Sequence, residues 1–158
     1  MPKQKLWVRL AAPGMAALLV VADQLIKGLM PQGEAVLIPH VLGLQYTRNY
    51  GISFSLFGNS AGAMRAVSII TGLVLLAGVV LLLAGKLRGA YTAGAVLVLA
   101  GGAGNLLDRL LHGYVVDYIE LLFMRFAIFN FADILITCGV AWLALWVLIW
   151  EPRARKKV

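Results

Sequence analysis

The chain has 158 residues, of which 61% are hydrophobic and only 13% are charged. Soluble globular domains carry roughly 25% charged residues, so this composition excludes an ordinary soluble domain and indicates an integral membrane protein. The length suits a single membrane domain with about four helical spans. A net charge of +7 would indicate a nucleic-acid partner in a soluble chain, but in a membrane protein it is interpreted by position, and we expect no nucleic acid.

The first predicted span covers about residues 10–30. It follows a basic start that contains Lys3, Lys5 and Arg9, and Pro31 ends it because proline stops a helix. A cleaved signal peptide is the alternative interpretation, since a basic start followed by an apolar run is typical of one. We favour a retained helix, because the apolar pattern continues for about 20 residues, which is enough to cross a bilayer.

Residues 31–60 differ in kind from the spans. Prolines and glycines interrupt short apolar runs there, a pattern typical of short strands joined by turns. Three more apolar runs follow, and they predict spans over about 64–84, 91–111 and 129–150. The residues between the last two spans, 112–128, are expected to form a loop.

Lysine and arginine are distributed unevenly along the chain. Three lie at the N-terminus, two in the loop 85–89 and four in the C-terminal tail, which makes nine of the fourteen. An even number of spans places these three regions on one side, and the positive-inside rule makes that side cytoplasmic. Both termini are therefore predicted to be cytoplasmic, and the β-rich segment 31–60 and the loop 112–128 are predicted to face outward.

Two aspartates lie among apolar neighbours. Asp117 precedes Tyr118, and Asp133 follows Phe131 and Ala132. Burial disfavours the charged form of a carboxylate, and two carboxylates brought together can share one proton, so that one acts as a base and the other as an acid. This is the chemistry of aspartyl hydrolysis. A helix cap at Asp133 and an exposed turn at Asp117 are the structural alternatives.

Nearly every ionisable residue within a span lies toward the same outer face. Asp23 and Lys27 are spaced i, i+4 and share a helix face. A second shared face is formed by Asn105, Asp108 and Arg109. Charges within a span usually face the protein interior and mark functional sites. We interpret Asn105 and Arg109 as residues that contact substrate or position a catalytic carboxylate, whereas structural ion pairing stays open for the other three.

Small residues precede Asn105. Gly101, Gly102 and Gly104 allow close approach of a helix or of a ligand.

The sequence offers no metal site. Cys138 is the single cysteine, and the two histidines lack the spacing of zinc ligands. We therefore expect neither a metal nor another cofactor.

These stretches together resemble one known family, the lipoprotein signal peptidases, or bacterial signal peptidase II. Five motifs carry the resemblance, in family order over most of the chain. They are Val21-Ala22-Asp23-Gln24-Leu25-Ile26-Lys27, Asn49-Tyr50-Gly51-Ile52-Ser53-Phe54-Ser55, Gly104-Asn105-Leu106-Leu107-Asp108-Arg109, Val116-Asp117-Tyr118 and Phe129-Asn130-Phe131-Ala132-Asp133.

The resemblance implies a membrane all-α four-helix bundle with a small extracytoplasmic β-rich cradle. Its activity would be that of an intramembrane aspartyl endopeptidase, which cleaves diacylglyceryl-modified prolipoproteins before the lipidated cysteine. Asp117 and Asp133 match the catalytic pair of the family. Polar or small positions that bind substrate or position the pair are matched by Asn49, Gly104, Asn105, Arg109 and Asn130. Structural support is implied for Asp23, Lys27 and Asp108.

The resemblance also implies a location and partners. We expect a monomer in the bacterial cytoplasmic (inner) membrane, in contact with membrane lipid and with its active site at the outer face. Two departures from the family pattern are visible. Ile52-Ser53 stands where two small residues are usual, which puts substrate preference in question, and Tyr118 stands where phenylalanine is common.

Three other functional classes fit the sequence less well. A transporter or proton-coupled channel would use intramembrane charges as a relay, but here the charges gather near one face and no inverted repeat is evident. A non-catalytic assembly subunit would use the charges only for helix pairing and would tolerate Asp117→Asn. A phosphatidyl-transfer enzyme is disfavoured because the chain lacks a repeated aspartate motif on one cytoplasmic-side helix.

Overall fold

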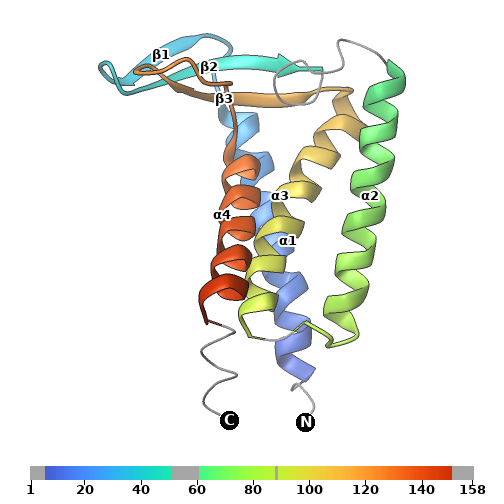
Figure 1. The fold of residues 1–158 in the computed structure, drawn as a ribbon. Coiled ribbons are helices and arrows are strands. Elements are labelled where there is room, and N and C mark those ends of the chain that lie inside the picture. Colours follow the sequence, from blue (N-terminus) through green and yellow to red (C-terminus); the bar gives the residue numbers. More distant parts are fainter. Residues whose placement is uncertain (1–5, 51–60, 88, 151–158) are drawn as a thin grey trace.

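The computed structural model describes residues 6–50, 61–87 and 89–150. In this part of the chain, four helices that are long and apolar enough to cross a membrane stand side by side, and a three-stranded antiparallel sheet lies across one end of them (Figure 1). The elements in chain order are α1 (Leu6–Leu29), β1 (Glu34–Ile38), β2 (Leu42–Asn49), α2 (Ala61–Leu83), α3 (Ala90–His112), β3 (Val115–Leu121), α4 (Phe131–Leu145) and the π-helical turn η2 (Trp146–Trp150).

Helix α3 is the central helix, and it packs against α1, α2 and α4. Small residues make this close packing possible. The backbone oxygen of Ala132 in α4 occupies the position that a Cβ at Gly101 would need, and a Cβ at Gly104 would lie 2.5 Å from Oδ2 of Asp23 in α1. The glycine-rich stretch of α3 therefore brings polar groups of α1 and the beginning of α4 within reach of one another.

The sheet has the strand order β1-β2-β3, and both strand pairs are antiparallel. Strand β3 occupies part of the 112–128 region for which a loop was expected, so that expectation needs correction. Its sequence, Val-Val-Asp-Tyr-Ile-Glu-Leu, contains three β-branched residues and a tyrosine, which suits a strand. Its partner is β2, and the pairing places Thr47 opposite Asp117. The partner and the register of this strand, unlike its β propensity, leave no local signal in the sequence.

The observed helices lie within a few residues of the predicted spans. Helix α4 begins at Phe131 rather than at Phe129, because Asn130 is its N-cap residue. Helix α1 begins, and η2 ends, at the end of the helices opposite the sheet (Figure 1). Strands β1 and β2 lie in the segment 31–60 that was predicted to be β-rich.

Some expectations fall outside the described residues. These are the remainder of the predicted β-rich segment, with Ile52 and Ser53, and most of the basic residues on which the predicted orientation rests. The effect of Ile52-Ser53 on substrate preference and the orientation of the chain therefore stay predictions.

Candidate active site

The site is built around the first turn of α4. Asn130 adopts an extended conformation, with φ of −134° and ψ of 180°, and its side chain accepts a hydrogen bond from the backbone N–H of Asp133 at 2.9 Å. In return, Oδ2 of Asp133 accepts a hydrogen bond from the backbone N–H of Asn130 at 3.1 Å. This reciprocal pair is a capping box, and it fixes the carboxylate of Asp133 at the beginning of the helix.

Two other elements hold the remaining N–H groups of this turn. The N–H of Ala132 donates to Oδ1 of Asp23 in α1 at 3.1 Å. The N–H of Phe131 donates to the hydroxyl oxygen of Tyr118 in β3 at 3.2 Å. Because these N–H groups have no partner inside the helix, the two side chains tie the position of α4 to α1 and to the sheet.

Asp117 lies on β3 and is almost completely buried, with 3% of its surface exposed. Its Oδ1 accepts a hydrogen bond from the side-chain amide of Asn130 at 2.7 Å, and its Oδ2 accepts one from Asn49 of β2 at 2.9 Å. Burial raises the pKa of Asp117 to about 6. The hydrogen bond from Asn49 acts against this rise in the pKa, and the negative charge of Asp133 adds to it.

The side chain of Asn130 therefore contacts both aspartates, which connects the two groups. Asn105 of α3 completes the arrangement: its side-chain amide donates to Oδ1 of Asp133 at 2.8 Å. The Oδ1 of Asn105 accepts a hydrogen bond from Asn130 at 3.1 Å. Three asparagines from β2, α3 and the α4 cap thus supply donors to the two carboxylates.

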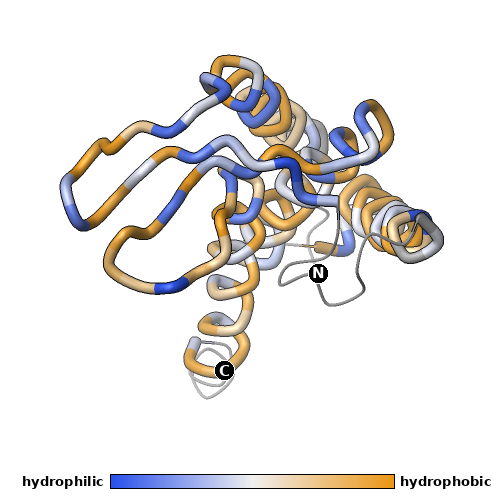
Figure 2. Tube along the Cα trace, turned by 90° about the horizontal axis from the view of Figure 1, so that it is seen from above, coloured by the Kyte–Doolittle hydropathy of each residue, from blue (hydrophilic) through white to orange (hydrophobic). Residues whose placement is uncertain are grey.

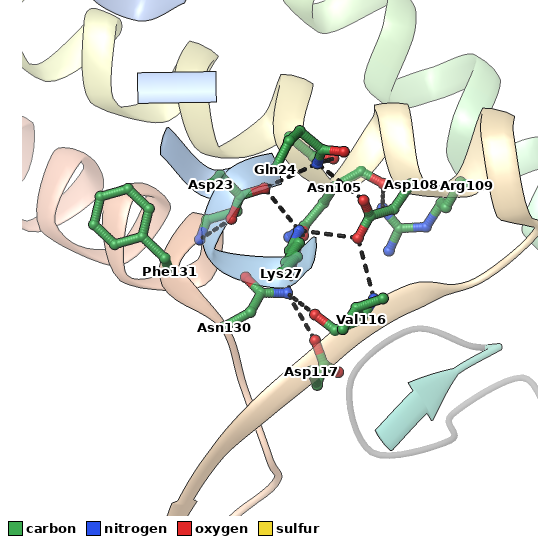
Figure 3. A network of polar contacts seen from close by, with 12 residues as sticks. Asp23, Gln24, Lys27, Asn105, Asp108, Arg109, Val116, Asp117, Asn130 and Phe131 are labelled. Carbon is green, nitrogen blue, oxygen red and sulfur yellow. Dashed lines mark hydrogen bonds and ion pairs between the residues drawn. The ribbon is translucent and has the colours of Figure 1, made fainter. Parts of the chain in front are cut away.

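Behind the aspartates lies a buried ion-pair network centred on Lys27 (Figure 3). Its Nζ lies 2.8 Å from Oδ2 of Asp23 and 3.0 Å from Oδ2 of Asp108, and it donates to Oδ1 of Asn105 at 3.0 Å. Gln24 donates to Oδ1 of Asp108 at 2.9 Å. One cation and an amide thus serve two buried carboxylates, which reduces the cost of burying them.

Each arm of this network ends next to one of the aspartates of the site. Oδ2 of Asp108 accepts a hydrogen bond from the backbone N–H of Val116, the residue before Asp117, at 3.1 Å. Oδ1 of Asp23 holds the N–H of Ala132, the residue before Asp133. The network therefore positions the backbone on which both carboxylates stand.

A cavity of about 650 Å³ opens in front of the two carboxylates. Its polar wall is formed by Asn49, Asn105, Arg109, Asp117 and Asp133. The apolar wall comes from α2, α4 and the segment that leads into α4, and it includes Val67, Phe126, Ile134 and Ile136. The cavity thus places two carboxylates beside an apolar surface.

Arg109 is held in this cavity with one donor unused. Its Nη1 donates to the backbone oxygen of Asn105 at 3.2 Å. Its Nε is buried and has no hydrogen-bond partner among the described residues. A buried donor without a partner is unfavourable, so this arrangement of Arg109 carries a local energetic cost.

The residues singled out in the sequence meet in one place. Five of them line the cavity, Asn130 contacts both aspartates, and the remaining four (Asp23, Lys27, Gly104 and Asp108) lie behind. The individual roles assigned to them stay predictions. Sequence analysis missed the contributions of Gln24 and of the Tyr118 hydroxyl, although a polar residue next to Asp23 and a hydroxyl in place of phenylalanine were visible signals.

Comparisons with known proteins give concordant results. A family model described as signal peptidase (SPase) II matches residues 15–149. A lipoprotein signal peptidase of Streptococcus agalactiae is 33% identical over 153 residues, covering 92% of this chain and 96% of the relative. One from Thermosynechococcus vestitus is 34% identical, with 88% and 90% covered.

Two solved structures have a fold similar to that of this chain. Two structures, both described as those of a bacterial membrane enzyme, are 29% identical to this chain, with TM-scores of 0.73 and 0.74. The first alignment covers 87% of both chains, and the second covers 89% of this chain and 94% of the other.

Proposed function

This chain belongs to the signal peptidase II family of aspartic proteases, and from this premise we propose that it removes signal peptides from diacylglyceryl-modified prolipoproteins by cleaving before the lipidated cysteine. The observation that carries the proposal is the placement of Asp117 and Asp133 on one cavity, with Asn130 hydrogen-bonded to both. Two carboxylates on one cavity, with Asp117 buried and Asp133 half-buried, are suited to sharing a proton and activating water.

The two aspartates take complementary roles in the proposed mechanism. Asp133 stands in the first turn of α4, where the helix dipole favours a negatively charged side chain, and it removes a proton from the attacking water. Asp117, whose pKa burial raises to about 6, begins protonated and donates its proton to the scissile carbonyl oxygen. On collapse of the tetrahedral intermediate, Asp133 protonates the leaving amine and Asp117 regains its proton. A titration of activity would report the pair rather than either residue.

The surrounding polar residues orient the reacting groups. Asn49 and Asn105 each hold one oxygen of a catalytic carboxylate, which restricts rotation of the carboxylates. Arg109, which lines the cavity, donates from its guanidinium group to a peptide carbonyl of the bound substrate. Positioning of this kind lowers the barrier because the groups need not reorganise during the reaction.

The substrate enters from the side, within the membrane. Helices α2 and α4 line opposite flanks of the cavity and α3 forms its floor, so the apolar wall receives the hydrophobic part of the signal peptide. The sheet covers the peptide near the cleavage site as a small cradle. The protein is a single membrane domain and a monomer of the bacterial inner membrane, with both termini cytoplasmic and the cavity at the outer face.

The proposal is tested by cleavage of a purified diacylglyceryl-modified prolipoprotein in detergent, followed by mass spectrometry of the product. Asp117→Asn and Asp133→Asn should each lower the rate by at least about 10³-fold, as loss of a group central to the chemistry does. Glu34→Gln is the matched control, because Glu34 is an exposed carboxylate of β1 far from the cavity lining, and it should leave the rate unchanged.

Two results would contradict the proposal. Retained cleavage in either aspartate variant would refute the dyad, and loss of cleavage counts in its favour only where the variant still unfolds cooperatively in detergent. Equal cleavage of a prolipoprotein that carries no diacylglyceryl group would refute the assignment of the lipidated substrate.

A further inference from the structure

The sheet extends sideways beyond the helices (Figures 1 and 2). The overhanging end consists of β1, the turn that follows it and the segment 121–127. These two parts are joined by a hydrogen bond from the N–H of Leu122 to the backbone oxygen of Val41 at 3.0 Å. They therefore meet at one end of the sheet, outside the ion-pair network and the two aspartates, and this end is called an edge below.

This edge exposes large apolar side chains. Exposed fractions of its members range from 48% to 64%, and the residues, here called the apolar edge, are Val36, Leu37, Ile38, Phe123, Met124 and Phe126. All five residues of β1 are exposed, so both faces of this strand lack cover in the described structure. An exposed apolar edge strand in water would invite aggregation, which means that the edge needs a partner.

Position and the basic residue of the edge identify this partner as lipid. Glu34 is the one acidic residue of the overhanging end, residues 34–42 and 121–127, and its Oε1 accepts a hydrogen bond from Gln45 of β2 at 2.9 Å. Arg125 is the basic residue between Met124 and Phe126. An arginine flanked by apolar side chains suits a phospholipid, because the stem packs against acyl chains while the guanidinium reaches a phosphate. The apolar edge is also continuous with the membrane-facing helices, since α4 begins a few residues after Phe126.

We propose that the apolar edge docks into the phospholipid leaflet at the sheet end of the helices, at the boundary between headgroups and acyl chains. The depth follows from the backbone. Strand β1 is an edge strand of the described sheet, so one side of it carries N–H and C=O groups without a neighbouring strand. Such groups are too costly in the hydrocarbon core but are hydrated in the headgroup region.

Docking of this kind fixes the depth at which the cavity lies in the membrane. Phe126 belongs to the apolar edge and also lines the cavity that contains Asp117 and Asp133. The leaflet boundary therefore meets the cavity wall directly. If the proposed function holds, this is the depth at which a lipid-anchored cysteine would be presented to the two aspartates.

The depth is measured with an environment-sensitive fluorophore on single cysteines in the full-length protein, with Cys138→Ala as the background. Test positions are Leu37→Cys and Phe123→Cys, and Met124→Cys provides an independent second site. Leu73→Cys on the exposed side of α2 is the acyl reference, and Arg48→Cys, an exposed cation of β2, is the water reference. The protein is reconstituted into phosphatidylcholine and phosphatidylglycerol vesicles with brominated acyl chains.

We expect labels at positions 37, 123 and 124 to be quenched by the bromolipid nearly as strongly as the label at 73, and to resist aqueous iodide. Iodide quenching as strong as at position 48 would show the edge to be in water and would overturn the proposal. Protection from both quenchers would show a protein, such as a second copy of the chain, on the edge, and would also overturn it. These outcomes do not depend on cleavage, so they are separate from any failure of the proposed activity.

Discussion

The ammonium group of Lys27 lies 3.0 Å from Oδ2 of Asp108, and the same carboxylate oxygen accepts the backbone N–H of Val116. This contact connects α1 and α3 to the strand that carries Asp117. Because the other arm of Lys27 reaches Asp23 and through it the beginning of α4, a single cation supports both carboxylates of the site.

Removal of this cation should be strongly destabilising. Lys27→Met keeps much of the side-chain volume but leaves two buried carboxylates without their counter-charge, and losing one partner of a buried ion pair costs about 3–5 kcal/mol. Thermal unfolding in detergent should show a clearly lower melting temperature, with loss of cleavage. Lys86→Met, at an exposed position outside the helices, is the control and should change neither property. Equal melting temperatures for the two variants would refute the supporting role of Lys27.

A methyl group at Gly104 should disturb the same network. The Cβ of Gly104→Ala would lie 2.5 Å from Oδ2 of Asp23, so either α1 or α3 must move. We expect a loss of stability of about 1–3 kcal/mol, typical of overpacking, and a fall in cleavage rate. Gly28→Ala is the matched control in α1, because nothing lies within 4 Å of its Cβ position and alanine favours a helix. A Gly104→Ala variant as stable and active as Gly28→Ala would contradict this close approach.

The helices were predictable from sequence because their signal is local. Long apolar runs mark them, and costly polar residues such as Asp23 and Asp108 stand out within those runs. Strand β3 was missed although Val115, Val116 and Ile119 favour a strand, and what the sequence does not show is its pairing with β2, which is distant in the chain. The i, i+4 spacing indicated the pair of Lys27 with Asp23, but nothing in the sequence shows that the same lysine also reaches Asp108.

Tyr118 shows how a departure from the family pattern acquires a physical meaning. Its hydroxyl accepts the N–H of Phe131 at the beginning of α4, and burial raises the pKa of this hydroxyl to about 12, so it stays neutral. Tyr118→Phe leaves that N–H without its acceptor, at a cost of about 1 kcal/mol. We expect a small drop in melting temperature and a reduced turnover number with little change in KM. Tyr50→Phe, at an exposed ring, should be neutral, and an unchanged Tyr118→Phe variant would refute the capping role.

The hydrogen bond from Asn49 should set the pH range of activity. It favours the ionised form of Asp117, so Asn49→Ala should raise the pKa of Asp117 further above its value of about 6. Since Asp117 acts in its protonated form in the proposed mechanism, the wild-type rate declines as pH rises through this pKa. The alkaline limb of the rate profile should therefore move to higher pH in the variant, even though its maximal rate falls. An alkaline limb that stays in place or moves to lower pH would contradict this role of Asn49.

The raised pKa of Asp117 should also make protein stability depend on pH. Its folded-state pKa of about 6 lies above the unfolded value of 3.8, so the folded chain holds a proton that the unfolded chain has released between these values. Stability is therefore lost as pH rises from about 4 to about 6, by up to roughly 3 kcal/mol for a shift of about two units. Asp117→Asn cannot ionise, so its melting temperature should exceed that of the wild type at neutral pH, and the difference should shrink toward pH 4. Glu34→Gln, which replaces an exposed carboxylate, should follow the wild type at every pH. If the difference in melting temperature between Asp117→Asn and the wild type did not depend on pH, the environment of Asp117 would not disfavour its ionised form.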